Sequence, residues 1–209
     1  MSLMFRIKRT SPNQLSDISQ INYRPNILRG VFYIGLVIAV LAVFASGGVA
    51  AQSADIMVAA DGSGDYTSIQ NAVDNASDSD YIEIQSGVYG ESIFINKNVT
   101  LYSSAGAMIS NTSNENRFAG ISVGSSAEPT ISGIQFTDWS IAIAASNSET
   151  NGSIENITIT DSAGGINIYN SSGAWEIKDI TIKNTTYGIS GFDSNSDWRV
   201  ENSIISGAE

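Results

Sequence analysis

The sequence predicts an all-β fold, a parallel β-helix of about 23 residues per coil with a capping helix at its N-terminal end. Three observations predict it. Apolar positions recur every twenty-three residues, short stretches alternate apolar and polar side chains, and turns of Gly, Asn, Asp and Ser separate these stretches. We expect this domain to cover residues 55–209, after a basic polar segment at residues 1–30 and an apolar segment at residues 31–51.

The first fifty-one residues have the layout of an export signal. Residues 1–30 carry five basic side chains and one acidic one, and an apolar run starts at Val31 and ends in the small residues Val49-Ala50-Ala51. Cleavage there would release a secreted protein. The run is also about long enough to cross a bilayer, so an uncleaved membrane anchor with its basic end in the cytoplasm is the alternative. Both alternatives place residues 52–209 outside the cell or on its surface, and only residues 31–51 would contact the membrane.

The stretch VAADGSGDYTSIQNAVDNA, residues 58–76, predicts a turn followed by a short amphipathic helix. Gly62 and Gly64 suit the turn, and Thr67 or Ser68 can cap the helix. Such a helix, laid across the open end of a solenoid, covers its apolar side chains and unpaired strand edges. The apolar stripe of the helix has the spacing i, i+3, i+4 and i+7 and consists of Ile69, Ala72, Val73 and Ala76.

The repeat itself predicts which side chains point inward. We expect the first coils to contain strands at residues 81–84, 92–95 and 99–102, and the later coils to stack like residues over like. A single coil buries too few apolar side chains to offset the entropy of ordering its backbone, so the coils must stack. The predicted inward columns are Ile131, Ile154, Ile177 and Val200; Ile134, Ile157 and Ile180; Phe136, Ile159, Ile182 and Ile205; and Ile143, Ile166 and Ile189.

Strand alternation places the flanking charges on the outer surface. Glu155, Lys178 and Glu201 share one outward register, and Glu176 and Arg199 share another. Opposite charges on adjacent coils predict a solvated cross-strand ladder, with a small contribution to stability from each pair.

Composition excludes several kinds of partner. Residues 52–209 hold five basic and twenty acidic side chains, a net charge near −15, which repels nucleic acid and anionic lipid. The chain has no Cys for disulfides and no His, the usual general base and a common metal ligand. No organic cofactor is evident. A polyanionic polysaccharide would also be repelled unless cations such as Ca²⁺ bridged it to the protein.

The segments DGSGDYTSIQNAVDNA, YIEIQSGVYGES and KNVTLYSS together resemble the start of the pectin-lyase-like superfamily, and among its members the pectin methylesterases. The resemblance covers roughly residues 58–103 and implies a right-handed β-helix. Gly87-Val-Tyr-Gly-Glu91 matches a G-x-Y-x-E motif that belongs to the framework of those esterases. Their catalytic Gln-Asp-Thr, Asp-Phe-Ile-Phe-Gly and Gly-Arg-Pro-Trp segments are absent from these 209 residues.

Asp138, Asp161 and Asn184 share one register after a predicted strand. Stacking would place the two carboxylates about 5 Å apart, a separation that suits a retaining glycosidase pair or a calcium site. The alternative is a ladder of turn residues, since Asp and Asn favour turns.

Three further side chains are candidates for ligand contacts. Trp175 and Trp198 stack in register and are candidates for binding sugar rings, although strand parity favours packing in the core or at a corner. Arg117 is the base without a predicted ladder partner. It is a candidate base for β-elimination, with an ordinary loop charge as the alternative.

Two classes of function follow. The first is an exported, carbohydrate-associated β-helix module of the cell surface that is non-catalytic within these residues. The second is the front part of a polysaccharide-active esterase, lyase or hydrolase with catalytic residues beyond Glu209. The repeat reaches Glu209 without a capping segment, so we expect the natural chain to extend further.

Overall fold

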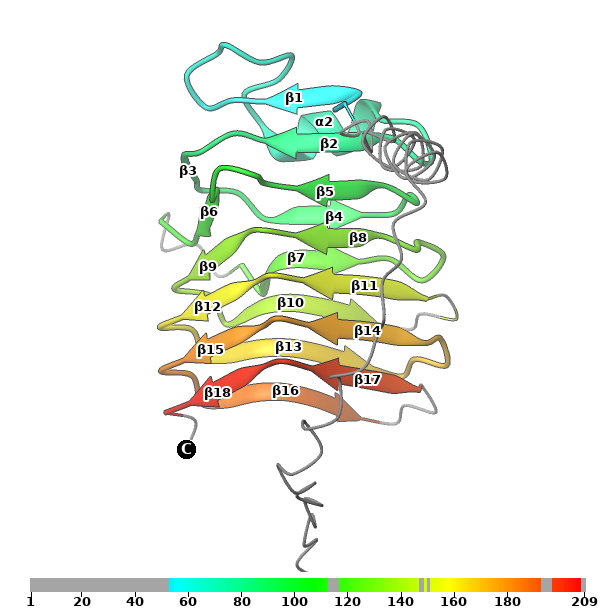
Figure 1. Ribbon diagram of the computed structural model, residues 1–209, viewed down its shortest axis with the longest axis vertical. Helices are drawn as coiled ribbons and strands as arrows, with labels where there is room; N and C mark the ends of the chain where they lie inside the picture. The colour runs from blue at the N-terminus through cyan, green and yellow to red at the C-terminus, as the bar shows by residue number, and fades with distance from the viewer. Residues whose placement is uncertain (1–52, 113–116, 147–148, 150, 193–196, 208–209) are drawn as a thin grey trace, which may run out of the picture. The chain divides into compact units, whose positions relative to one another are not determined.

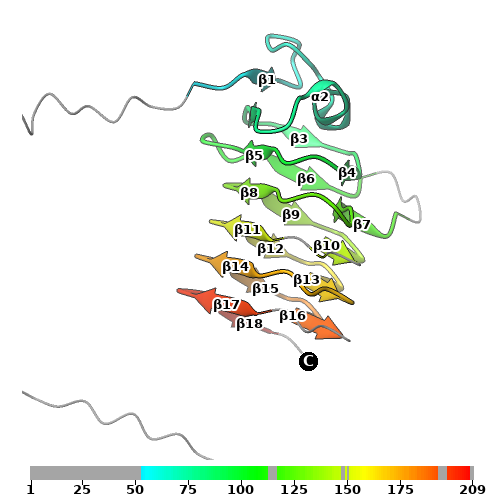
Figure 2. The same ribbon diagram turned by 90° about the vertical axis from the view of Figure 1, so that its right-hand side faces the viewer.

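The computed structural model describes residues 53–112, 117–146, 149, 151–192 and 197–207. The described residues form a β-solenoid of about six turns with one short helix (Figure 1). Each complete coil contributes one strand to each of three parallel sheets, and Figure 2 shows the strands of successive coils stacked in order. The predicted parallel β-helix is therefore confirmed. The predicted segments at residues 1–30 and 31–51 lie outside the described residues.

The three sheets differ in their number of strands. The seven-stranded sheet contains β1 (Ile56–Val58), β2 (Tyr81–Ile84), β5 (Thr100–Tyr102), β8 (Thr130–Ser132), β11 (Gly152–Glu155), β14 (Trp175–Lys178) and β17 (Trp198–Glu201). The six-stranded sheet contains β3 (Val88–Tyr89), β6 (Met108–Ser110), β9 (Gln135–Thr137), β12 (Thr158–Thr160), β15 (Thr181–Lys183) and β18 (Ile204–Ser206). The five-stranded sheet contains β4 (Ile93–Ile95), β7 (Ala119–Val123), β10 (Ile141–Ser146), β13 (Gly164–Tyr169) and β16 (Tyr187–Phe192).

The strands pair in the register that the repeat predicts. Ile154 of β11 lies between Ile131 of β8 and Ile177 of β14, and all three side chains are fully buried. Ile159 lies in the same way between Phe136 and Ile182. Stacked apolar columns thus make one continuous core, in which the apolar side chains of each coil are buried against those of the neighbouring coils.

The predicted capping helix is confirmed as α2 (Ile69–Asn75), with Ser68 as its N-cap residue. The Ser68 hydroxyl accepts a hydrogen bond from the backbone N–H of Asn71, which satisfies one of the free donors of the first turn. Three side chains of the predicted stripe, Ile69, Ala72 and Val73, are fully buried against the first coils. The helix covers the N-terminal end of the core, as its sequence pattern indicates.

Two charged side chains from the first coil hold the ends of α2. The Glu91 carboxylate accepts from the Ser68 hydroxyl at 2.7 Å and from the backbone N–H groups of Ile69 and Gln70 at 2.7 and 3.2 Å. At the other end, the Lys97 ammonium donates to the carbonyls of Val73, Asp74 and Ala76. Both charges suit the helix dipole. Glu91 of the G-x-Y-x-E motif is therefore a structural anchor.

A strand above α2 was not predicted from the sequence. β1 pairs with β2, with Ile56 opposite Ile82 and Val58 opposite Ile84. The loop after β1 then turns back tightly, and a Cβ atom on Gly64 would come within 2.6 Å of the Met57 carbonyl oxygen. The glycine of this turn is therefore required by a close approach of the backbone.

At the opposite end, the last described coil lacks the cover that the earlier coils have. Val200 is 46% exposed and Ile205 is 45% exposed, although both continue columns that are buried in the coils above. Among the described residues, no helix has the length and apolar character needed to cross a membrane.

Candidate functional site

A ladder of hydrogen bonds runs along the corner of the solenoid where the strands of the seven-stranded sheet begin. In each step, a side-chain oxygen of one coil accepts the backbone N–H of the residue below it. The steps join Asp78 to Asn98 (2.9 Å), Asn98 to Glu128 (2.8 Å), Glu128 to Asn151 (3.4 Å) and Asn151 to Ala174 (2.8 Å). The ladder fixes the turns of five successive segments without any β-strand pairing.

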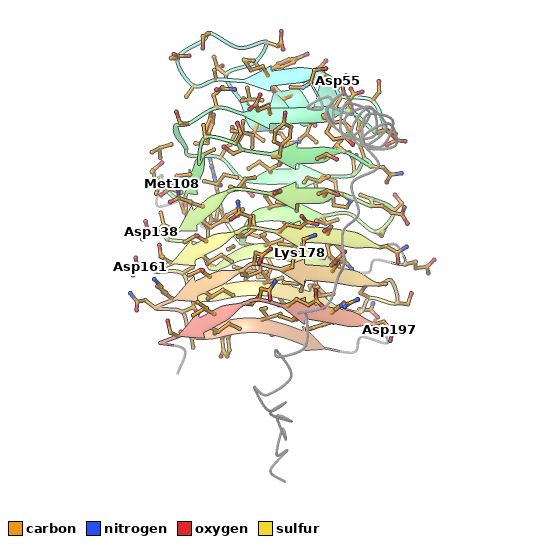
Figure 3. The ribbon with its side chains drawn as sticks, in the orientation of Figure 1. Asp55, Met108, Asp138, Asp161, Lys178 and Asp197 are labelled. Atoms are coloured by element: carbon orange, nitrogen blue, oxygen red, sulfur yellow. The ribbon has the colours of Figure 1, made fainter. Side chains whose placement is uncertain are left out.

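The ladder stops at Ala174, whose methyl group cannot accept a hydrogen bond, and a shallow groove opens there. The groove has a volume of about 520 Å³, within the range of small-ligand sites. Its lining residues come from four coils at positions twenty-three apart, so the groove runs along the direction of stacking. The lining positions are 128–130, 151–153, 174–176, 197 and 199. Figure 3 shows Asp197 at this edge of the stack.

The charged side chains of the groove are mostly acidic. The lining contains three acidic side chains, Glu128, Glu176 and Asp197, and one basic side chain, Arg199. The register places Glu176 beside Arg199, as predicted. However, the Arg199 guanidinium is hydrogen-bonded and ion-paired to Glu201 on its own strand, at 2.6 Å. Within the described residues, the carboxylates of Glu176 and Asp197 therefore keep their hydrogen-bond acceptors available to a ligand.

The two predicted tryptophans lie beneath this corner. Trp175 is 1% exposed and belongs to the core, while Trp198 is partly buried against the core. The Trp175 ring fills the space left by Gly152, since a Cβ atom on that glycine would lie 2.6 Å from Cη2 of the indole. Trp175 lies beneath the groove, in the core, and offers no free ring face to a sugar. Its indole N–H is buried and has no hydrogen-bond partner among the described residues.

The register of Asp138, Asp161 and Asn184 is a column of left-handed turn residues. Their φ angles are 64°, 50° and 53°, and Gly207 continues the column at 69°. Asp, Asn and Gly are the residues that adopt this conformation most readily. The Asn184 amide donates to the Asp161 carboxylate at 3.2 Å, and the Thr137 hydroxyl donates to the Asp138 carboxylate at 3.2 Å. These contacts match the turn-ladder alternative.

Asp138 and Asp161 also lie away from the groove. Figure 3 shows both residues at the edge of the stack opposite Asp197. In the described part of the chain, no three side chains of the Asp, Glu, His or Cys type converge to hold a metal ion. A calcium site at Asp138 and Asp161 would therefore need at least one ligand other than a third acidic side chain.

Arg117, the candidate base for β-elimination, makes a structural contact. Its guanidinium donates to the backbone carbonyl of Gly90 at 2.7 Å, next to the helix anchor Glu91. This bond ties the start of β7 to the coil above.

The outward face of the seven-stranded sheet carries the predicted charge ladder. Lys178 and Glu155 form an ion pair at 2.9 Å, and the Ser153 hydroxyl also donates to Glu155. Partial burial raises the pKa of the Glu155 carboxyl, but hydrogen bonds from Lys178 and Ser153, with the charge of Lys178, outweigh it and lower that pKa. The hydrogen bond to Glu155 raises the pKa of the Lys178 ammonium. The pair is part of the framework beside the groove.

Sequence reasoning missed the groove, although its signal was present. Glu128, Asn151, Ala174 and Asp197 are each twenty-three residues apart, and all four are exposed. The polar column at the corner has no large apolar members, so a repeat defined by large apolar side chains does not include it.

One of the comparisons with known proteins identifies the family of the fold. A family model described as "Right handed beta helix region" matches residues 83–209. No curated protein matches the sequence. Two solved structures of the pectin methylesterase from Aspergillus niger, in deglycosylated and penultimately deglycosylated form, match with a TM-score of 0.39. They are 14% and 15% identical to this chain, and each match covers 77% of this chain and 88% of the other. Similarity at this level carries no argument about chemistry.

Proposed function

The chain belongs to the right-handed β-helix family, and from that premise we propose that it is an exported module of the cell surface that binds polysaccharide without transforming it. The groove at the Ala174 corner carries the proposal. It is concave, spans four coils, and combines a mostly apolar surface with the acceptors of Glu176 and Asp197. Sugars present the same two surfaces, because pyranose rings have apolar faces and hydroxyl donors at their edges.

Three observations support the part of the proposal that the module does not transform its ligand. The Asp138 and Asp161 pair consists of turn residues with left-handed backbone and local hydrogen bonds. Arg117 and Glu91 are engaged in contacts that hold the first coils together. The catalytic segments of the esterases that the opening resembles are missing from the sequence.

Export is supported by sequence alone. The basic segment at residues 1–30, the apolar run that follows it, and the acidic, Cys-free remainder fit a protein made for the cell exterior. Protease treatment of intact cells, with N-terminal sequencing of the product, tests this part. We expect residues 52–209 to be accessible from outside. Protection of these residues in intact cells would contradict export.

The function is tested by measuring binding and turnover in the same samples. The full chain is incubated with xylan, mannan, β-glucan, pectin and alginate, with and without calcium. We expect retention on at least one glycan and no new reducing ends, unsaturated ends or methanol. Retention of none of these glycans would refute the binding module. Release of product that is lost in the D138N/D161N variant would support the alternative, a polysaccharide-active enzyme.

A further inference from the structure

We propose that the groove takes an uncharged polysaccharide, with the sugar chain lying along the stacking direction of the coils; this inference rests on the proposed binding function. A groove of about 520 Å³ lined by four successive coils is elongated along the axis. The coils repeat about every 4.8 Å, so the lined corner extends over roughly 14 Å. A short run of sugar rings fits this length, and equivalent positions on successive coils meet successive rings.

Charge excludes a polyuronate from the groove. Such a polymer carries one carboxylate on each sugar, and it would meet Glu128, Glu176 and Asp197 at one corner of a domain that is itself near −15. The base at the groove, Arg199, is already paired with Glu201. Like charges this close repel even when salt screens them in part.

Calcium bridging of a polyuronate would need a cation site at the groove. A calcium ion binds about six to eight oxygen ligands, and carboxylates of the protein are the strongest of those it can offer. Among the described residues, no group of three acidic side chains is placed to hold one. The groove therefore differs in chemistry from a site for pectic acid, despite the resemblance of the N-terminal sequence.

The surface chemistry of the groove fits an uncharged sugar, and the test below includes an amino-sugar polymer as the alternative. More of the groove surface is apolar than polar, and among the apolar residues that line it Ala174 is exposed. The free oxygens of Glu176 and Asp197 lie at exposed positions, where they can accept from hydroxyl groups. The Asn151 amide oxygen is used by the ladder, but within the described residues its Nδ2 group makes no hydrogen bond and can donate.

The test compares two tryptophan substitutions within one coil. Ala174→Trp fills the groove, whereas Ala163→Trp places the same side chain at another exposed alanine, beside Asp161. Binding of the full chain is measured with oligosaccharides of β-glucan, mannan and xylan, with polygalacturonate, and with chitosan, at low and high salt. A thermal melt of each variant confirms that it is folded.

We expect an uncharged oligosaccharide to bind, with an affinity reduced at least tenfold by Ala174→Trp, unchanged by Ala163→Trp and insensitive to salt. Polygalacturonate should not bind the natural sequence, and E176Q/D197N should raise its binding by removing two repelling charges. Polygalacturonate or chitosan binding that Ala174→Trp abolishes would overturn the ligand class but keep the binding function. Uncharged binding that survives Ala174→Trp would overturn the groove. The absence of any glycan binding would refute the proposed function itself.

Discussion

At the scale of single residues, Asp138, Asp161 and Asn184 have two candidate roles, as turn residues or as residues of an active site. Left-handed backbone at all three positions explains why Asp and Asn occur there. A turn residue and a catalytic residue respond differently to substitution, because the turn needs a conformation and the catalyst needs a carboxylate. The choice of replacement therefore separates the two roles.

Asp161→Ala should lower the free energy of unfolding by about 1–2 kcal/mol, because alanine is strained at a φ of 50°. It also removes the acceptor of the Asn184 amide. Asp161→Asn and Asp161→Gly should be nearly neutral, since both residues accept this conformation. Urea unfolding of the three variants checks the order. An Asp161→Asn variant as unstable as Asp161→Ala would show that the carboxylate itself is needed.

The two buried indoles offer a second contrast. The Trp139 N–H donates to the Ile109 carbonyl at 3.0 Å, whereas the Trp175 N–H has no partner among the described residues. Trp139→Phe should therefore cost about 1–3 kcal/mol more than Trp175→Phe, because it removes a hydrogen bond from a buried carbonyl. Denaturant midpoints of both variants measure this difference. Equal losses would mean that packing alone determines both positions.

Glu155 gives a pH dependence with a defined sign. Its pKa in the folded chain lies below the ordinary value of 4.5. A carboxyl with a lowered folded pKa stabilises the fold above its unfolded pKa, and this stabilisation is lost as the pH falls through the folded value. The E155Q variant should therefore lose less stability than the natural sequence between about pH 5 and pH 3. Urea midpoints across this range test it, and parallel curves for the two proteins would contradict it.

At the scale of elements, α2 is held in place more by its two charged anchors than by its own length. Seven residues are too few for a stable helix in isolation. Glu91 satisfies donors at one end, Lys97 satisfies acceptors at the other, and three buried side chains attach the face between them.

Glu91→Ala should lower the free energy of unfolding by about 1.5–3 kcal/mol, the usual cost of losing hydrogen bonds to a charged group. Glu176→Ala is the matched control, because Glu176 is exposed and accepts no hydrogen bond within the described structure. Amide hydrogen exchange should show faster opening of residues 69–75 in the Glu91 variant. Unchanged protection of α2 would mean that side-chain burial alone holds the helix.

At the scale of the whole molecule, the 23-residue repeat explains why most of the fold could be predicted from the sequence. Every coil buries the same positions against its neighbours, so the inward columns at Ile131, Phe136 and Ile143 are visible as a repeat in the sequence. The capping helix is also visible, since its stripe and its Ser68 cap are local patterns. The strand β1 was missed because three residues without a repeat partner carry no periodic signal.

The groove could not be predicted in the same way. It depends on the end of a side-chain ladder at Ala174, and on Arg199 pairing with Glu201 rather than with Glu176. The first is visible as a column once the coil geometry is known. The second is a choice between two adjacent carboxylates, which register alone does not decide.

The central claim is that glycan binds at the Ala174 corner and not at the Asp138 edge. The most direct measurement is a map of backbone amide chemical shifts during titration with an uncharged oligosaccharide. We predict that the amides of Asn151, Ala174 and Asp197 shift in proportion to ligand bound, while those of Asp138, Asp161 and Asn184 stay unchanged. Shifts that concentrate at Asp138 and Asp161 and leave Ala174 unmoved would contradict the account.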